Sequence, residues 1–317
     1  MPDLEGNPVR HPDSCCLLGA PIGTGAGVAG CDFGPAAYRD AGLAEALKDA
    51  GWRVADLGDI SPAPVPAVHH PNPAIRHLPE TVGMIRGLGT AALDAGRRHA
   101  LPVFLGGDHS IAAATIPAMA LRAREAGRPF FVLWLDAHPD LHSLETTCSG
   151  NLHGTPAAYF MGLGGFGAFP VIAAPVAPAN VCMLGLRSID GAEAARLAAL
   201  GIDAHPMAEL DETGVAAPLA RFLARVGREG GHLHVSFDVD FLDPALAPGV
   251  GTTVPDGATG DQARSIAGLI GDSGLVTSLD LVELNPRLDP DGRSARMMRD
   301  LATRMLPPRA ALQKTGS

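Results

Sequence analysis

The chain has 317 residues, 46% of them hydrophobic, which is enough to bury a large core within one α/β domain. A formal net charge of -10, with no run of Lys or Arg, argues against nucleic acid or an anionic membrane surface as a partner and leaves small molecules. The five cysteines are scattered without a CxxC pair, so neither a disulfide framework nor a thiolate metal site is indicated.

The start of the chain is polar and Pro-rich and lacks the basic and then apolar layout of a signal peptide. No apolar run reaches the length of a membrane span. We therefore expect a cytoplasmic protein. We also expect a single domain over residues 1–317, with flexible ends at about 1–12 and 307–317.

Short apolar runs alternate with longer stretches of helical character, a pattern typical of a parallel sheet covered by helices and therefore of the α/β class. Two Pro- and Gly-rich segments, 60–79 and 162–178, are predicted to be loops. The predicted strands are 16–20, 52–57, 101–105, 130–135, 181–186, 232–237 and 277–282, with 201–205 as a candidate eighth. The predicted helices are 34–50, 79–100, 111–126, 192–199 and 215–228.

The first segment that carries chemistry is VFLGGDHS, residues 103–110, where an apolar strand runs into two glycines and then into polar residues that begin a helix. His109 therefore lies at the carboxyl end of a predicted strand. Taken alone, the segment fits equally well a tight turn in which Asp108 and Ser110 cap the helix. A metal-binding role for His109 needs further ligands nearby.

The second segment, FFVLWLDAHPD, supplies such ligands. Asp136, His138 and Asp140 lie at i, i+2 and i+4, so in an extended conformation their side chains would project from one face. Gathered there, they would desolvate and repel one another without a cation. The alternative, a turn at Pro139 with solvated acids, requires no such clustering, and we favour metal ligation.

The third segment, HLHVSFDVDFLDP, repeats this spacing after another apolar strand. Asp238 and Asp240 are two residues apart and so share a face in an extended strand. His232 and His234 have the same parity but lie deeper in the strand, and we interpret both as sheet or core residues.

All three segments deliver polar residues to the carboxyl ends of strands, where open α/β sheets bind their ligands. Their four carboxylates would be balanced by two divalent cations. Oxygen-rich ligation with imidazole suits Mn²⁺ best among common metals, and Zn²⁺, Ni²⁺, Co²⁺ and Fe²⁺ stay open. Two neighbouring metals normally activate a bridging hydroxide, which makes hydrolysis the expected reaction class. The candidate metal ligands are His109, Asp136, His138, Asp140, Asp238 and Asp240.

The motifs GGDHS, DAHPD, SGNLHG, SFDVDFLDP and LVELNP, in this order, resemble those of the arginase/agmatinase (ureohydrolase) family. The resemblance covers nearly the whole chain. It implies a three-layer α/β/α fold with a central, mostly parallel eight-stranded sheet and two Mn²⁺ ions at its carboxyl edge. It also implies a homo-oligomer, either a trimer or a hexamer, and a reaction that splits a guanidino compound into urea and an amine.

The resemblance also assigns the ligands and the catalytic residues. It implies that Asp136 and Asp238 bridge the two ions, with His109 and Asp140 completing one site and His138 and Asp240 the other. Asp140 would orient the hydroxide that attacks the guanidinium carbon. His153, in SGNLHG, matches the family's proton-shuttle histidine. Glu283, in LVELNP, matches the acid that pairs with the guanidinium group, helped by Thr252. Without the family, His153 could be a capping loop residue and Glu283 a surface acid.

Further matches point to arginine as the first-choice substrate. Ser149 matches a residue that contacts the α-carboxylate, and Asp190, assisted by Glu193, matches the reader of the α-amino group. The sequence departs from the family pattern at His142, where many arginases carry Asn, and in the loop GTTVPDG. Guanidinobutyrate, guanidinopropionate, agmatine and guanidine therefore stay open as substrates. The remaining alternatives are a single-zinc deacetylase of related fold and an inactive paralogue.

Overall fold

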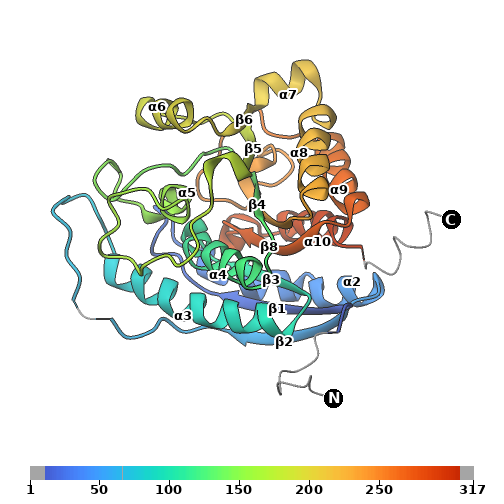
Figure 1. Cartoon of the computed structure of the whole chain (residues 1–317), viewed down its shortest axis with the longest axis horizontal. Coiled ribbons are helices and arrows are strands. Elements are labelled where there is room, and N and C mark those ends of the chain that lie inside the picture. The colour runs from blue at the N-terminus through green and yellow to red at the C-terminus, as the bar shows by residue number, and fades with distance from the viewer. Residues whose placement is uncertain (1–10, 66, 308–317) are drawn as a thin grey trace.

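The computed structural model describes residues 11–65 and 67–307, which fold around one eight-stranded sheet (Figure 1). All neighbouring strands are parallel and follow the order β2-β1-β3-β8-β7-β4-β5-β6, which confirms the predicted α/β class. The strands are β1 (Ser14–Ala20), β2 (Arg53–Asp59), β3 (Leu101–Gly106), β4 (Phe130–Leu135), β5 (Val181–Leu186), β6 (Asp203–Pro206), β7 (His232–Asp238) and β8 (Val276–Val282).

The structure does not test the predictions for the chain ends and for the number of domains. Of the expected flexible ends, 1–10 and 308–317 lie outside the described residues. The single domain over 1–317 stays a prediction. Within the described residues, no helix combines the length and the apolar character that a membrane crossing requires.

Alternating side chains on each strand feed two hydrophobic cores, one on each face of the sheet. In β4, Phe131 and Leu133 enter one core while Val132 and Trp134 enter the other, as the two-residue period of a strand requires. The first core is covered by α1 (Gly34–Asp40), α2 (Leu43–Asp49), α7 (Met207–Thr213), α8 (Ala216–Arg228), α9 (Gly260–Ser273) and α10 (Arg293–Met305). The second is covered by α3 (Leu78–Arg98), α4 (Ala112–Glu125), α5 (Pro156–Phe160) and α6 (Gly191–Leu200).

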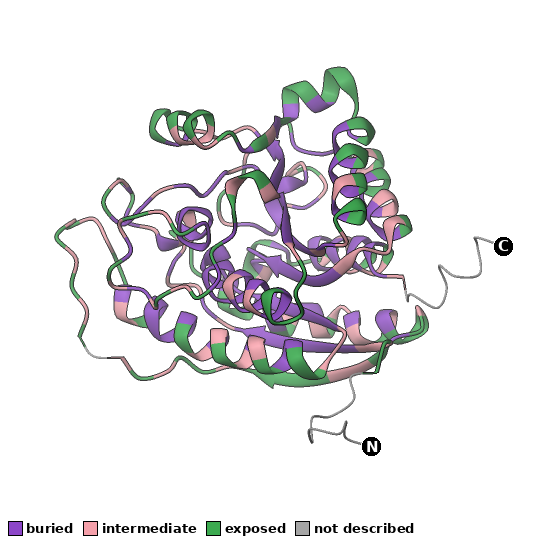
Figure 2. Cartoon of the chain, in the orientation of Figure 1, coloured by how far each residue is buried: buried purple, intermediate pink, exposed green. Residues whose placement is uncertain are grey.

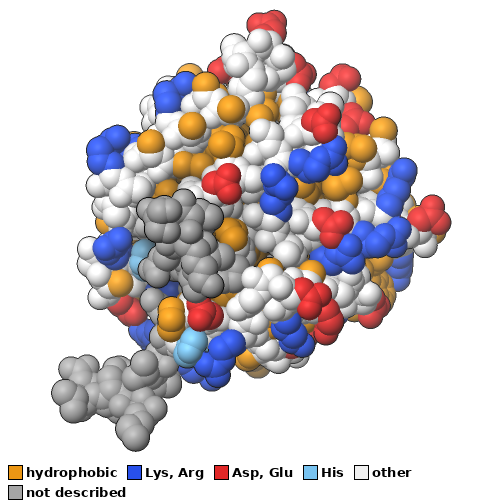
Figure 3. All heavy atoms as spheres, turned by 90° about the vertical axis from the view of Figure 1, so that its right-hand side faces the viewer, with side chains coloured by type: hydrophobic (Ala, Val, Ile, Leu, Met, Phe, Trp, Pro, Cys, Tyr) orange, Lys and Arg blue, Asp and Glu red, His pale blue; other side chains and the backbone are white. Residues whose placement is uncertain are grey.

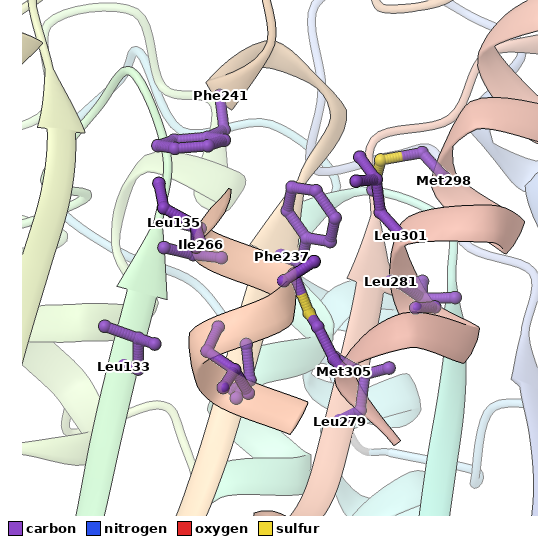
Figure 4. Close-up of a cluster of buried hydrophobic side chains, with 14 of the residues drawn as sticks. Leu133, Leu135, Phe237, Phe241, Ile266, Leu279, Leu281, Met298, Leu301 and Met305 are labelled. Carbon is purple, nitrogen blue, oxygen red and sulfur yellow. The ribbon is translucent and has the colours of Figure 1, made fainter. Parts of the chain in front are cut away.

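These two cores make the three-layer α/β/α architecture that the family resemblance implies. Figure 2 shows that the central strands are buried between helices whose outward faces are exposed, whereas the edge strand β2 is largely exposed. Figure 4 shows part of the first core, where Phe237 and Leu281 of neighbouring strands meet Ile266 of α9 and Met305 of α10. The sheet is therefore fixed from both sides.

Several helices differ from the predictions. The helix expected at 34–50 is two helices, α1 and α2, because Gly42 adopts a left-handed conformation with φ 81° between them. Helices α5, α7, α9 and α10 were not predicted. For α9 the sequence carried a signal, since Thr259 and Gln262 form a capping box at its start.

Figure 3 views the molecule from the side that carries α8, α9 and α10 in Figure 1. Basic and acidic side chains are interspersed on this face, with apolar side chains between them. Ion pairs in these helices or at their ends, such as Arg264 with Asp261 in α9 and Arg225 with Glu229 at the end of α8, fit the mixture. The excess negative charge is therefore not gathered on this side.

Replacing Leu281 with Ala should lower the free energy of unfolding by about 2–5 kcal/mol, because the side chain is 0% exposed and its removal leaves a cavity in the first core. Denaturant unfolding followed by circular dichroism measures this change. Leu288, which is 42% exposed, supplies a control of the same chemistry. Leu288→Ala should shift the value by about 0.5 kcal/mol or less, and equal losses from both variants would contradict the packing.

Candidate metal centre and substrate pocket

Four neighbouring strands end at one edge of the sheet and bring the predicted site residues together. In sheet order, β3 leads to His109, β8 to Glu283, β7 ends at Asp238, and β4 leads to Asp136. The turn after β3 needs glycine at 107, because a Cβ atom there would lie 1.7 Å from the carbonyl oxygen of Ile22. The carbonyl of Gly107 accepts a hydrogen bond from the Glu283 backbone N–H at 2.8 Å, which joins two of these ends.

His109 lies at the centre of the first ligand group. Its Nδ1 atom is 2.9 Å from Asp136 Oδ2, 3.1 Å from Asp238 Oδ2 and 3.3 Å from Asp140 Oδ2. Donor atoms around a six-coordinate ion with bonds of about 2.1 Å stand about 3 Å apart along each edge. The three carboxylates and the imidazole therefore have the spacing of ligand atoms that share one ion.

His138 forms a second ligand group beside the first. Its Nδ1 atom lies 2.9 Å from Asp240 Oδ2 and 3.5 Å from Asp136 Oδ1. Asp136 thus presents one oxygen to each group, the arrangement expected of a carboxylate that bridges two ions. Asp238 has its Oδ2 atom in the first group, while its Oδ1 atom accepts a hydrogen bond from the Asp240 backbone N–H.

The structure corrects the reason given for this clustering. The residues do not share the face of an extended strand, because β4 ends at Leu135 and Asp140 adopts a left-handed conformation with φ 50°. After β7, Asp238 caps the 3₁₀ helix η5 (Val239–Phe241), which contains Asp240. Tight turns beyond the strand ends, rather than strand alternation, bring the carboxylates together.

The pKa values of the acids and histidines in this cluster indicate that it would bind cations. Burial alone would lower the pKa of His109, but Asp136, Asp140 and Asp238 raise it well above its ordinary value. Burial and the neighbouring acids Asp240 and Asp136 raise the pKa of Asp238 well above its usual range. A raised pKa means that a group binds a proton more readily. The raised pKa values of both the imidazole and the carboxyl group therefore indicate an excess of negative charge in the cluster.

The orientation of His109 supports metal ligation. Its Nε2 atom lies 2.8 Å from the Ser236 hydroxyl, and its ring stacks on Trp134 with centroids 4.0 Å apart. The Nδ1 atom and Asp136 Oδ2 are both buried and close, yet not aligned for a hydrogen bond with each other. Two buried ligand atoms without hydrogen-bond partners, at this distance from each other, fit a shared divalent cation. Histidines that bind metals are usually held in orientation by a partner on the other ring nitrogen, as His109 is here by Ser236.

Glu283 and His153, predicted separately, are in direct contact. Glu283 Oε1 lies 2.8 Å from His153 Nδ1 and accepts a hydrogen bond from the His109 backbone N–H at 2.7 Å. Burial would lower the pKa of His153, but the Glu283 carboxylate raises it to about 9. Glu283 also adopts a left-handed conformation with φ 64°, a strained geometry that clusters at functional sites.

A second polar group lies further along the pocket. His142 Nε2 is 2.9 Å from Asp190 Oδ2, while Asp190 Oδ1 accepts hydrogen bonds from the first backbone N–H groups of α6. Glu193 accepts from the backbone N–H groups of Leu141 and Asp190. Glu193 therefore ties the loop that carries His142 to the start of α6.

Both groups line one pocket of ≈ 320 Å³, a volume suited to a small molecule. Ser149 and Thr252 also line it, as do Asn151 and Ser188, which the sequence analysis did not select. Asn151 lies inside the SGNLHG motif, so its position in the sequence was a usable signal. No contact joins Thr252 to Glu283 among those found in the described residues.

Comparison with known proteins tests what this site belongs to. A family model described as "Arginase family" matches residues 13–307. The chain is 55% identical to an arginase of Agrobacterium fabrum, over 92% of this chain and 90% of that protein, and 54% identical to an arginase of Brucella melitensis biotype 1, over 92% and 95%.

The chain belongs to the arginase family. Its fold agrees with the solved structure of arginase from Bacillus caldovelox, with a TM-score of 0.85 and 32% identity over 92% of this chain and 98% of that one. Membership of the arginase family confirms the resemblance seen in the five motifs and favours a guanidino hydrolase over the single-zinc deacetylase.

Replacing Asp136 with Ala should lower metal content and metal affinity together, since this side chain contacts both ligand groups. Losing one of several ligands in each group should weaken binding by at least about 10–100-fold. Metal bound per chain after equilibrium dialysis measures the effect. Asp261→Ala, at an exposed position on α9, is the control and should keep the wild-type content; full retention by Asp136→Ala would refute the assignment.

Proposed function

We propose that this protein is an arginase that hydrolyses L-arginine to L-ornithine and urea. The observation that carries the proposal is the 54–55% identity to proteins named arginase over 92% of the chain. The site supports it, because a metal-binding cluster lies in the same pocket as polar groups suited to an amino-acid head. The enzyme is a hydrolase that acts on a guanidino C–N bond.

We propose two Mn²⁺ ions per chain, held by the two ligand groups. One ion would take His109, Asp136, Asp140 and Asp238, and the other Asp136, His138, Asp238 and Asp240. Oxygen-rich ligation with one imidazole per ion suits Mn²⁺. When bound, two such ions supply a hydroxide that is nucleophilic at neutral pH.

The residues around this cluster would position the substrate and move protons. Glu283 is buried and negatively charged, and its carboxylate would pair with the planar guanidinium group. His153 has its Nδ1 atom held by Glu283, so its Nε2 atom would exchange the proton that the leaving amine requires. Asp140, which contacts His109, would orient the attacking hydroxide.

The other end of the pocket would bind the amino-acid head. Asp190 Oδ2 would accept from the α-amino group, and His142 and Ser149 would donate to the α-carboxylate. Glu193 would act by positioning His142 and Asp190, since its oxygens already accept from backbone N–H groups. Thr252 would support the guanidinium end from the rim of the pocket.

We further propose a cytoplasmic homo-oligomer, a trimer or a hexamer, as the family resemblance implies. Its partner would be the small guanidino substrate. Because His142 replaces the Asn of many arginases, guanidinobutyrate, guanidinopropionate, agmatine and guanidine are the alternative substrates.

Urea release by Mn²⁺-loaded protein should be strongest with arginine. Agmatine lacks the α-carboxylate, so His142 and Ser149 would lose their partner, and we expect kcat/KM to fall by about 100-fold or more. The assay compares arginine, agmatine, guanidinobutyrate, guanidinopropionate and guanidine. Preference for another compound would retain the hydrolase and refute the arginine assignment, and no urea from any of them would favour the inactive paralogue.

Replacing His153 with Ala should lower kcat by about 100-fold or more, because a positioned general acid or base contributes on that scale. Metal content should stay at the wild-type value, because the proposed ligands are untouched. Steady-state kinetics and metal analysis on the same sample separate the two effects. An unchanged kcat would reduce His153 to a loop residue that holds Glu283.

A further inference from the structure

A second cluster of metal-ligand side chains lies on β5 and β6, at the edge of the sheet opposite to β2. Cys182, near the start of β5, is in register with Asp203 of the edge strand β6, and His205 follows two residues later. The ligand atoms of these three side chains all lie within 4.8 Å of one another. Cys182 and His205 are buried, whereas Asp203 is exposed.

The two ring nitrogens of His205 face different acids. Nε2 lies 2.9 Å from Asp203 Oδ1, and Nδ1 lies 2.9 Å from Glu209 Oε1 in the first turn of α7. Histidines that bind metals usually donate the other ring N–H to a carboxylate, which fixes the tautomer and increases the basicity of the ligating nitrogen. With Nδ1–H directed to Glu209, the lone pair of Nε2 points to the side of Asp203.

We propose that Cys182, Asp203 and His205 form a metal site, separate from the catalytic cluster, that binds a zinc-class divalent cation. Thiolate, imidazole and carboxylate together suit tetrahedral Zn²⁺ better than Mn²⁺, which prefers oxygen. In a tetrahedral zinc site the sulfur lies about 3.6 Å from each of the other ligand atoms. The three ligand atoms here lie within 4.8 Å of one another, so the Cys182 and His205 side chains, as well as Asp203, would have to close up slightly around the ion. Water would take the fourth position.

The competing arrangement is an ion pair, in which a protonated His205 lies between two acids beside a neutral thiol. Burial, followed by the charge of Asp203, raises the pKa of Cys182 well above its ordinary value, while Arg221 of α8 lowers it. The thiol therefore keeps its proton in the absence of a metal, and a bound cation would have to displace it. Metal binding and the ion pair predict different spectra.

The proposed site has a structural consequence for the edge of the sheet. β6 has four residues and, among the strands that the structure describes, pairs with β5 alone; α7 begins directly after it. Figure 1 shows β5, β6 and α7 together at one end of the molecule. An ion held by β5 and β6, with its histidine held by α7, would fasten all three elements where an edge strand is most exposed to unpairing.

Cobalt absorption tests the proposal directly. The catalytic cluster offers only nitrogen and oxygen ligands, so a thiolate-to-Co²⁺ band in the near ultraviolet reports a cysteine site. Full-length protein preloaded with Mn²⁺ is titrated with Co²⁺ and then with Zn²⁺. We expect the absorbance of this band to saturate at one Co²⁺ ion per chain beyond the catalytic cluster. Added Zn²⁺ should remove the band, and the Cys182→Ala variant should lack it. Absence of the band in the wild-type protein would overturn the proposal.

Two other cysteines are the controls for this titration. Cys148 is exposed and free, and Cys148→Ala should leave the band unchanged. Cys31 lies 3.5 Å from Glu283 Oε2, beside the catalytic cluster. A band that Cys31→Ala removes and Cys182→Ala preserves would place the thiolate at the catalytic cluster and overturn the proposal.

Two exposed acids on α7 test the role of Glu209 without threatening the fold. Glu209→Gln should weaken Zn²⁺ affinity about 10-fold, since the amide no longer holds His205 as a charged acceptor. Glu212→Gln, on the same helix, should leave the affinity unchanged. Competition with a chromophoric chelator measures both. Equal affinities for the two variants would overturn the assignment of His205 and its acid as a ligand pair, even if Cys182→Ala does not fold.

Discussion

Four carboxylates and two imidazoles crowded at one edge of the sheet are the constraint on which the site depends. Ionised acids at these distances repel one another, and burial removes the water that would screen them. The structure relieves part of this charge with backbone N–H groups, which donate to Asp136, Asp238 and Asp240. It relieves another part through the imidazoles. Both are substitutes for the positive charge that divalent cations would supply.

The order of the strands makes this crowding possible. Four strands that are distant in sequence, β3, β8, β7 and β4, are neighbours in the sheet. Their carboxyl ends therefore lie side by side at one edge. Helices on both faces bury these strands, which fixes the ends from which the ligands project. The remaining placement is achieved by strained backbone at Asp140 and Glu283, whose left-handed conformations cost about 1–3 kcal/mol each. The packing of the sheet between its helices holds these residues in the strained conformation.

The sequence predicted the fold class and which acids and histidines lie together at the sheet edge, and it failed where the answer depended on turns or on distant contacts. Periodicity identifies buried strands, so seven strands and the candidate eighth were found. It could not show that Asp136, His138 and Asp140 lie in a turn, because in the sequence a two-residue spacing fits a turn as well as an extended strand. Nor could it reveal the contact of His153 with Glu283, 130 residues apart, or that of Cys182 with Asp203, which only the register of β5 and β6 creates.

Substrate choice is linked to the fold through Asp190. Its Oδ1 atom caps α6, which leaves Oδ2 as the oxygen that faces His142 and the pocket. The proposed reader of the α-amino group is therefore rigid, and the neighbouring imidazole sets which atoms it can offer. An amino-acid head presents an ammonium beside a carboxylate, which matches an acidic acceptor beside an imidazole donor. A guanidino compound with only one of these groups would leave the other member of the His142–Asp190 pair without its partner in the pocket, and that loss would be the physical basis of discrimination.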